Sequence, residues 1–255
     1  ALTLETPVAE ILPEFCMADE RYQSITVRML LDHSSGLMGD STRNAFLFDD
    51  TDPQAADALL RRLATQRLKA DPGAYSVYCN DGFTLAELVV EVVSGMDFDD
   101  YMRQAILEPA GLEDTWFPGE DFDQSLLAKT YYGADETRAL PAETVGVHGT
   151  GGIYATASDL AAFGGAVFCE DGILSADAIA ASMADEYARG IWPEDTLDSL
   201  AYGLGWDNVQ WYPFCQSDIV ALTKGGDTLY YHAALVVLPE YHMAAAVLTS
   251  GGLST

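Results

Sequence analysis

The spacing of apolar residues changes along this chain, and that change restricts the folds available to it. In the middle, residues 83–93 are apolar nearly all round and are followed by Gly95, which is typical of a buried helix with a glycine C-cap. Residues 97–107 have the spacing of an amphipathic helix, and Pro109 is expected to end it. The middle of the chain is therefore predicted to be helical.

Further helices are indicated by their capping residues. Asp52-Pro53 is typical of an N-cap followed by proline at the first helical position. Serine caps predict two more helices, over residues 158–168 and 175–183.

The C-terminal part is predicted to form strands. Residues 229–238 and 243–249 are β-rich apolar runs, and the Pro-Glu-Tyr-His segment between them is typical of a hairpin. Residues 221–223 are expected to begin the strand before them. This order predicts an α+β protein, with a mainly helical portion over roughly residues 20–148 and a sheet-containing portion over roughly residues 149–255. A ligand cleft is expected between the two.

Charge excludes some classes of partner. The chain has 40 acidic and 12 basic residues, and its formal net charge is −28. Such a field repels phosphate backbones and anionic lipid surfaces, so nucleic acid is not an expected partner. The acidic excess is typical of a heavily solvated surface, and cation binding is a weaker alternative. No apolar run reaches the roughly 18–20 residues that a membrane-spanning helix needs.

The cysteines argue against a metal site. Cys16, Cys79, Cys169 and Cys215 are widely spaced and form no C-x-x-C pair, and the histidines share no metal-ligand spacing. Two disulfides are one alternative, and buried free thiols are the alternative that a chain of this length favours.

Three short segments carry residues that could form one active site. They are Tyr78-Cys79-Asn80, Gly151-Gly152-Ile153-Tyr154 and Lys224-Gly225-Gly226. Taken singly, the first and third are typical of a turn and a loop, and the glycine pair of a tight backbone turn. The chain has only three lysines, which draws attention to the one placed before two glycines.

Together with residues 25–37, Ile-Thr-Val-Arg-Met-Leu-Leu-Asp-His-Ser-Ser-Gly-Leu, these segments resemble the serine β-lactamase and penicillin-binding protein family, on the side of class C β-lactamases, DD-peptidases and related esterases. The order of the segments along the chain supports the resemblance more than any one of them. Further matching stretches are residues 3–15, Pro72-Gly73, residues 107–117 and Tyr202-Gly203-Leu204-Gly205-Trp206.

The resemblance implies a β-lactamase/transpeptidase-like fold, with an antiparallel sheet flanked by helices and a mainly helical subdomain. Residues 1–255 would form one such domain with its N- and C-terminal parts missing. The family acylates a serine in an S-x-x-K motif, and no serine here is followed three residues later by lysine. The motif is expected one or two dozen residues upstream of Ala1. Without the missing parts, the chain is expected to self-associate, and the family favours a location outside the cytoplasm.

The resemblance also implies roles for the motif residues. Tyr78 would shuttle protons, Asn80 would orient substrate amide or carbonyl groups, and Lys224 would supply positive charge. Gly225, Gly226 and Asp227 would bind substrate along a strand, where backbone N–H groups stabilise an oxyanion. No metal and no organic cofactor would be needed. His33 is interpreted as a residue that bonds the backbone at a turn.

Two functional interpretations remain open. The first is a serine hydrolase acting on an ester, a D-Ala-D-Ala-type peptide or a β-lactam. Lys224-Gly225-Gly226 lacks the middle hydroxyl of the usual K-T-G, which argues against efficient recognition of a β-lactam carboxylate and favours ester or peptide hydrolysis. The second is a binding or interaction module that retains the fold without the chemistry.

Overall fold

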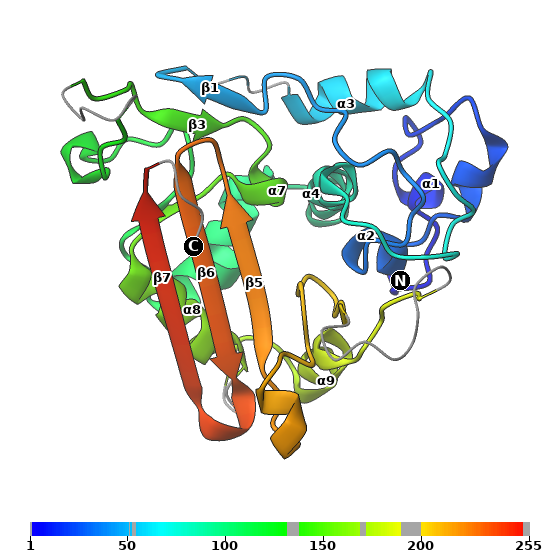
Figure 1. The fold of residues 1–255 in the computed structure, drawn as a ribbon. Coiled ribbons are helices and arrows are strands. Elements are labelled where there is room, and N and C mark those ends of the chain that lie inside the picture. The colour runs from blue at the N-terminus through cyan, green and yellow to red at the C-terminus, as the bar shows by residue number, and fades with distance from the viewer. Residues whose placement is uncertain are drawn as a thin grey trace.

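Helices from the first half of the chain gather on one side of the molecule, and the last three strands form a sheet on the other (Figure 1). This computed structural model describes residues 2–50, 52, 55–131, 138–168, 172–189 and 200–251. The helices are α1 Val8–Ile11, α2 Val27–Leu31, α3 Ala55–Leu63, α4 Asn80–Ser94, α5 Phe98–Met102, α6 Glu108–Ala110, α7 His148–Gly151, α8 Ala157–Phe168 and α9 Ala176–Met183. The strands are β1 Phe46–Phe48, β2 Thr115–Trp116, β3 Glu143–Val145, β4 Tyr154–Ala155, β5 Leu222–Asp227, β6 Tyr231–Leu238 and β7 Met243–Ser250.

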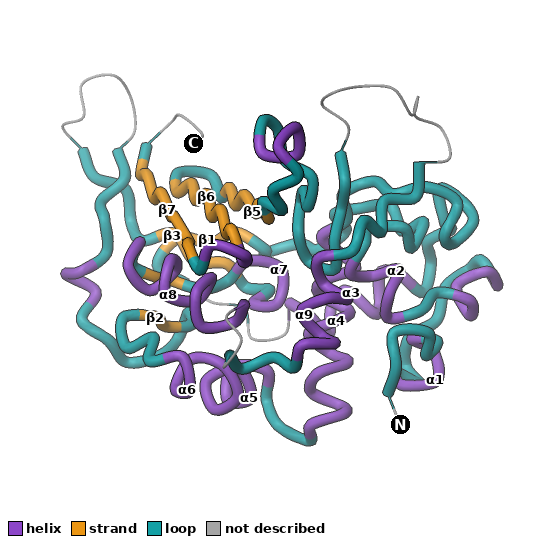
Figure 2. Tube along the Cα trace, turned by 90° about the horizontal axis from the view of Figure 1, so that it is seen from below, coloured by secondary structure: helices purple, strands orange, loops and turns teal. Residues whose placement is uncertain are grey.

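The predicted C-terminal hairpin is confirmed. β5, β6 and β7 form an antiparallel sheet in that order, and a short 3₁₀ turn, Pro239–Tyr241, joins β6 to β7. α8 lies along one face of β6 and β7 (Figures 1 and 2). Gly164 permits this close packing, because a Cβ there would lie 2.7 Å from the Val237 side chain. Two smaller antiparallel pairs, β1 with β3 and β2 with β4, lie outside this sheet.

α4 is central to the helical side. It packs against α2, and glycine permits the contact because a Cβ at Gly82 would lie 3.1 Å from the carbonyl oxygen of Leu30. Gly95 ends α4 in the left-handed conformation at φ 70°, as predicted. The prediction that this helix is buried all round is wrong at its C-terminal end, because Val92 and Val93 are 57% and 52% exposed.

Other helix boundaries differ from prediction. Pro109 does not end a helix: the π turn Arg103–Leu107 follows α5, and Pro109 then lies in the first turn of α6, where the missing N–H is tolerated. Gly111, at φ 67°, ends α6. Thr156, rather than a serine, caps α8, since its side chain accepts from the Asp159 N–H. Ser175 caps α9 as predicted.

Two sequence predictions fall partly outside the described residues. Pro53 is not described, although α3 begins close to Asp52, whose carbonyl accepts from the Ala55 N–H. Cys169 is not described either. Cys79 is a buried free thiol, whereas the free thiol of Cys16 is exposed. The α+β class is confirmed. None of the described helices has the length and apolar character to cross a bilayer.

Candidate active site

Tyr78 and Asn80 lie where α4 begins. Cys79 has the extended conformation of an N-cap residue, and Asn80 is the first residue of the helix. Tyr78 is 44% exposed. Its ring packs against that of His33, with the two ring centroids 4.4 Å apart and the ring planes tilted by 32°. The sequence Tyr-x-Asn therefore starts a helix rather than forming a free turn, and it presents the phenol at the helix N-terminus.

His33 fixes the backbone on both sides of Tyr78. The Val77 N–H donates to the His33 carbonyl at 3.0 Å, and the Cys79 N–H donates to His33 Nδ1 at 3.0 Å. Burial, and next the positive charge of Lys224, lower the pKa of His33 to about 4. The ring is therefore neutral near pH 7, as an accepting Nδ1 requires. This agrees with the expectation that His33 bonds the backbone.

The glycine-rich turn is attached to the same helix. Thr150 in α7 donates to the Asn80 carbonyl at 3.2 Å, and its hydroxyl lies 2.8 Å from that of Thr84. The Gly149 N–H donates to the Glu87 carboxylate at 2.8 Å. Burial raises the pKa of Glu87 to about 7. These contacts hold the start of α4 against α7, and both segments line one cavity.

Lys224 projects from β5 and meets Tyr78. Its Nζ lies 3.2 Å from the Tyr78 hydroxyl oxygen and 2.8 Å from the Gly225 carbonyl oxygen. The side chain is 32% exposed. Burial acts to lower the pKa of Lys224, but the charge of Asp207 and the contact with Tyr78 outweigh it, so the pKa is raised above its ordinary value. The structure thus brings together two motif residues separated by 146 positions in the chain.

Asp207 is a site residue that the sequence reasoning missed. Its carboxylate oxygens lie 3.0 and 3.2 Å from Lys224 Nζ, and one of them accepts from the Gly225 N–H at 2.8 Å. The available signal was its position, directly after the Tyr-Gly-Leu-Gly-Trp segment. An acidic residue is unremarkable in so acidic a chain, so that signal was weak.

The outer edge of β5 faces the cavity. The Thr223 N–H donates to the Asn208 carbonyl and the Gly225 N–H to Asp207, both on the side away from β6. Because backbone N–H groups alternate along a strand, the Asp227 N–H points to this same edge. Gly226 intervenes and pairs with Ala233 of β6. The edge therefore presents a backbone donor at Asp227, and Asp227 lines the same cavity as Tyr78 and Lys224.

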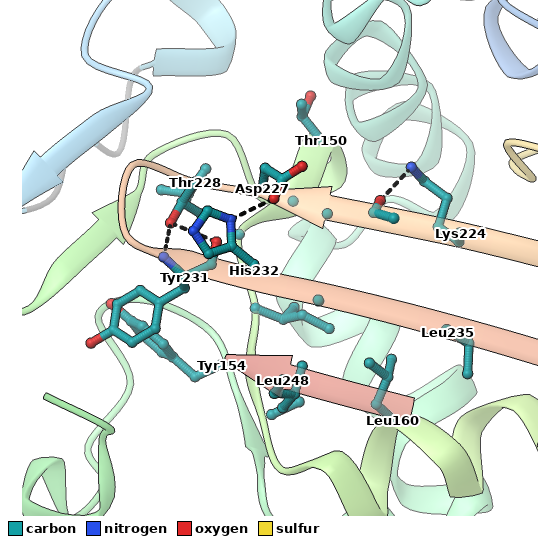
Figure 3. Close-up of a pocket in the computed structure, with 18 of the residues that line it drawn as sticks. Thr150, Tyr154, Leu160, Lys224, Asp227, Thr228, Tyr231, His232, Leu235 and Leu248 are labelled. Atoms are coloured by element: carbon teal, nitrogen blue, oxygen red, sulfur yellow. Dashed lines mark hydrogen bonds and ion pairs between the residues drawn. The ribbon is translucent and has the colours of Figure 1, made fainter. Parts of the chain in front are cut away.

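His232 and Glu143 hold the C-terminal end of β5, and the sequence did not indicate either as a site residue. The Asp227 carboxylate contacts His232 Nδ1 at 2.5 Å (Figure 3). His232 Nε2 lies 3.0 Å from the Gly251 carbonyl oxygen. Buried Glu143 accepts from the Thr228 hydroxyl and the Leu229 N–H, each at 2.8 Å. The Asp227 carboxylate is therefore paired with His232 of the sheet, although the side chain remains 60% exposed.

A cavity of about 1250 Å³ joins these groups. One side is apolar, where Leu235 and Leu248 of the sheet lie near Leu160 of α8 (Figure 3). Among its described lining residues, Lys224 is the only lysine or arginine. The lining carboxylates are Asp40, Asp114, Glu143, Asp207 and Asp227.

Serines near the site have other contacts. Ser34 and Ser35 are only 2% and 1% exposed. Ser182 and Ser250 line the cavity, but Ser182 accepts from the Trp206 indole at 3.1 Å and Ser250 donates to the Lys129 carbonyl at 3.3 Å. A buried hydroxyl cannot reach a substrate carbonyl, which argues against Ser34 and Ser35 as nucleophiles.

Comparison with known proteins identifies relatives of the whole chain. The beta-lactamase family model matches residues 1–254. Penicillin-binding protein 4 of Amycolatopsis lactamdurans is 30% identical over 276 residues, covering 100% of this chain and 67% of that protein. An octameric penicillin-binding protein homologue from Pyrococcus abyssi has a TM-score of 0.74 at 23% identity, covering 98% of this chain and 56% of that one.

A D-stereospecific amidohydrolase from a Streptomyces species has a TM-score of 0.71 at 18% identity, covering 98% of this chain and 75% of that one. These structural neighbours share the predicted β-lactamase/transpeptidase-like fold. The chain spans about two thirds of the Amycolatopsis protein and little more than half of the Pyrococcus one. The family match over nearly every residue shows that this chain belongs to the beta-lactamase family, which includes penicillin-binding proteins.

Proposed function

We propose that this site transfers an acyl group from an ester, a D-Ala-D-Ala-type peptide or a β-lactam to a serine, and then to water. The serine would come from an S-x-x-K segment that is not among the 255 residues. The observation that carries the proposal is the pair formed by the Tyr78 hydroxyl and the Lys224 ammonium, 3.2 Å apart at the cavity. A phenol needs a nearby cation to act as a base near neutral pH, because positive charge stabilises the phenolate.

The chemistry assigns one proton path. Tyr78, as phenolate, accepts the proton of the serine hydroxyl while the serine oxygen bonds to the substrate carbonyl carbon. The bond to the leaving group then breaks, and Tyr78 returns the proton to the departing alcohol or amine. Water repeats the sequence on the acyl-enzyme and regenerates the serine. The Asp227 N–H, on the outer edge of β5, would donate to the oxyanion that forms in each half.

Labelling tests this proposal. The complete gene product should react with a fluorophosphonate at a serine followed three residues later by lysine, and its Tyr78→Phe variant should react far more slowly. The 255-residue chain should not react, because Ser34 and Ser35 are buried. Stoichiometric labelling of Ser34 or Ser35, located by mass spectrometry, would overturn the assignment of the nucleophile.

A binding module without chemistry is the second candidate. A complete coding sequence without that motif, together with no labelling by fluorophosphonate or fluorescent penicillin, would select this alternative. An intact motif that labels would exclude it.

A further inference from the structure

The Asp207 carboxylate holds the two groups that a substrate carboxylate would use. One group is the Lys224 ammonium, whose Nζ lies 3.0 and 3.2 Å from the two carboxylate oxygens. The other is the Gly225 N–H, which donates to one of those oxygens at 2.8 Å. A cation and an adjacent backbone N–H are the usual partners of a bound carboxylate. Asp207 therefore sits as a carboxylate ligand would.

Each of the three N–H groups of the Lys224 ammonium has an acceptor. An ammonium has three N–H bonds. Its acceptors are the Tyr78 hydroxyl at 3.2 Å, Asp207 at 3.0 Å and the Gly225 carbonyl at 2.8 Å. An incoming carboxylate would have to displace one of these, and it would meet the Asp207 charge while doing so.

Asp207 is also held in place by its backbone. Its N–H donates to the Thr223 carbonyl at 2.9 Å, and the next residue bonds Thr223 again, since the Thr223 N–H donates to the Asn208 carbonyl at 2.9 Å. Trp206, on its other side, is buried, with its indole N–H donating to Ser182 at 3.1 Å. The Asp207 main chain is therefore anchored on both sides, which restricts how far its carboxylate can withdraw from β5.

The charge of the surrounding residues also disfavours an anionic ligand. Lys224 is the only lysine or arginine among the described lining residues, against several carboxylates, and the whole chain carries a net charge of −28. A negative field of this kind lowers the local concentration of anionic ligands.

We propose that Asp207 is a specificity residue that makes the site select acyl donors without a carboxylate beside the scissile bond, namely uncharged esters and amides. This inference rests on the proposed acyl-transfer function and narrows its substrate class. It places β-lactams and peptides ending in a free carboxylate among the poor substrates.

Two esters that differ in one charge test the inference on the complete gene product. Phenyl acetate is uncharged, and 3-acetoxybenzoate carries one carboxylate on its leaving phenol, close to the scissile ester bond. The wild type should favour the uncharged ester by about tenfold or more in kcat/KM, since placing like charges together is costly. Asp207→Asn should remove most of that preference, chiefly by lowering KM for the charged ester.

Two control variants separate the local contact from general charge. Asp40→Asn removes a carboxylate from the cavity lining that makes no hydrogen bond to Lys224 in the structure, so the preference should change less than about threefold. Asp207→Glu keeps the charge and should keep the preference for the uncharged ester. If Asp207→Asn folds poorly, the comparison of the two esters with the wild type still tests the inference.

A binding measurement distinguishes failure of the inference from failure of the proposed function. Calorimetric titration with N-acetyl-D-alanine and with its amide needs no nucleophile, and Asp207→Asn should shift the affinity ratio toward the carboxylate ligand. Ester hydrolysis with no charge preference, or with a preference that Asp207→Asn leaves unchanged, overturns the inference alone. Absence of hydrolysis with a binding ratio that shifts as expected overturns the function and supports the selectivity. A wild type that binds the carboxylate ligand more tightly than the amide overturns the inference directly.

Discussion

At the scale of single residues, the charge balance around Lys224 separates two chemical roles. Because the net effect of its surroundings raises the pKa of Lys224, the side chain remains an ammonium near pH 7. An ammonium cannot accept a proton, so Lys224 acts as a fixed positive charge. Tyr78, within hydrogen-bond distance of that charge, is then the proton acceptor of the pair.

Tyr78→Phe removes only the phenol oxygen, and it is expected to lower kcat of the complete gene product by roughly 10²–10⁴, the usual range for losing a general acid–base group. Lys224→Ala should cost a similar factor. Stability should change little in Tyr78→Phe, because Tyr78 is 44% exposed. Tyr241→Phe is the matched control, since Tyr241 is 53% exposed on the turn before β7. Near-full turnover by Tyr78→Phe on each substrate class would refute the proton-shuttle role.

His33 should make folding stability depend on pH. Its folded pKa is about 4, below the ordinary value of 6.5. The unfolded state therefore binds more protons between those values, and the free energy of unfolding should fall as pH is lowered from about 6.5 toward 4. His33→Asn removes the ring but tolerates the left-handed φ of 62°. Urea unfolding at pH 7, 5.5 and 4.5 should show that the free energy of unfolding falls less with acid in the variant than in the wild type. An equal fall in the two proteins would contradict a role for His33 in this pH dependence.

The sequence predicts residues of the candidate site only where they lie in motifs whose order along the chain resembles that of the family. Tyr78, Asn80 and Lys224 stand in segments that resemble family motifs, and the structure brings the first and last into contact. Asp207 and Glu143 contribute through contacts that only the fold creates. Glu143, for example, bonds a turn about 86 residues away in the chain, and no local pattern marks it.

At the scale of elements, the short turn α7 depends on one glycine of its pair and not on the other. A Cβ at Gly152 would lie 2.7 Å from the His148 Cα, whereas one at Gly151 would meet nothing within 4 Å. α7 is hydrogen-bonded to α4 through Thr150 and Gly149, and α4 begins two residues after Tyr78. Strain in α7 would therefore be transmitted to the site.

Gly152→Ala is expected to destabilise the protein by about 1–3 kcal/mol through overpacking, because the contact it creates is with backbone that cannot move aside. Gly151→Ala is the matched control and should cost far less. Chemical unfolding of both variants under identical conditions measures the difference. Equal stability of the two would show that the turn adjusts freely.

Element types were predictable where a periodic pattern and a capping residue agree. The hairpin and the end of α4 at Gly95 are examples. Boundaries were harder, because they depend on tertiary contacts. Thr156 follows strand β4 directly and caps α8. Pro109 lies in the first turn of α6, after a π turn that no propensity indicates.

At the scale of the whole molecule, exposed apolar surface and net charge have opposite effects on self-association. β7 pairs only with β6 among the described strands, which leaves an outer edge. On it, Met243 and Val247 are 59% and 55% exposed. Unpaired edges with apolar side chains favour association with another strand. The net charge of −28 repels a second copy of the chain, and salt screens that repulsion.

We therefore expect the 255-residue chain to self-associate, and more strongly as salt is added. Burying each ~400 Å² of apolar surface is worth roughly 10 kcal/mol before the cost of association is subtracted, enough to matter against the whole stability of a domain. Sedimentation velocity at low micromolar concentration should show dimers or larger species that increase from 50 mM to 500 mM NaCl. Val247→Lys places a charge on the exposed edge and should shift the distribution toward monomer, whereas Val92→Lys, on α4 and equally exposed, should not. A monomer with a cooperative melt at every salt concentration would mean that the β7 edge is compatible with an isolated chain.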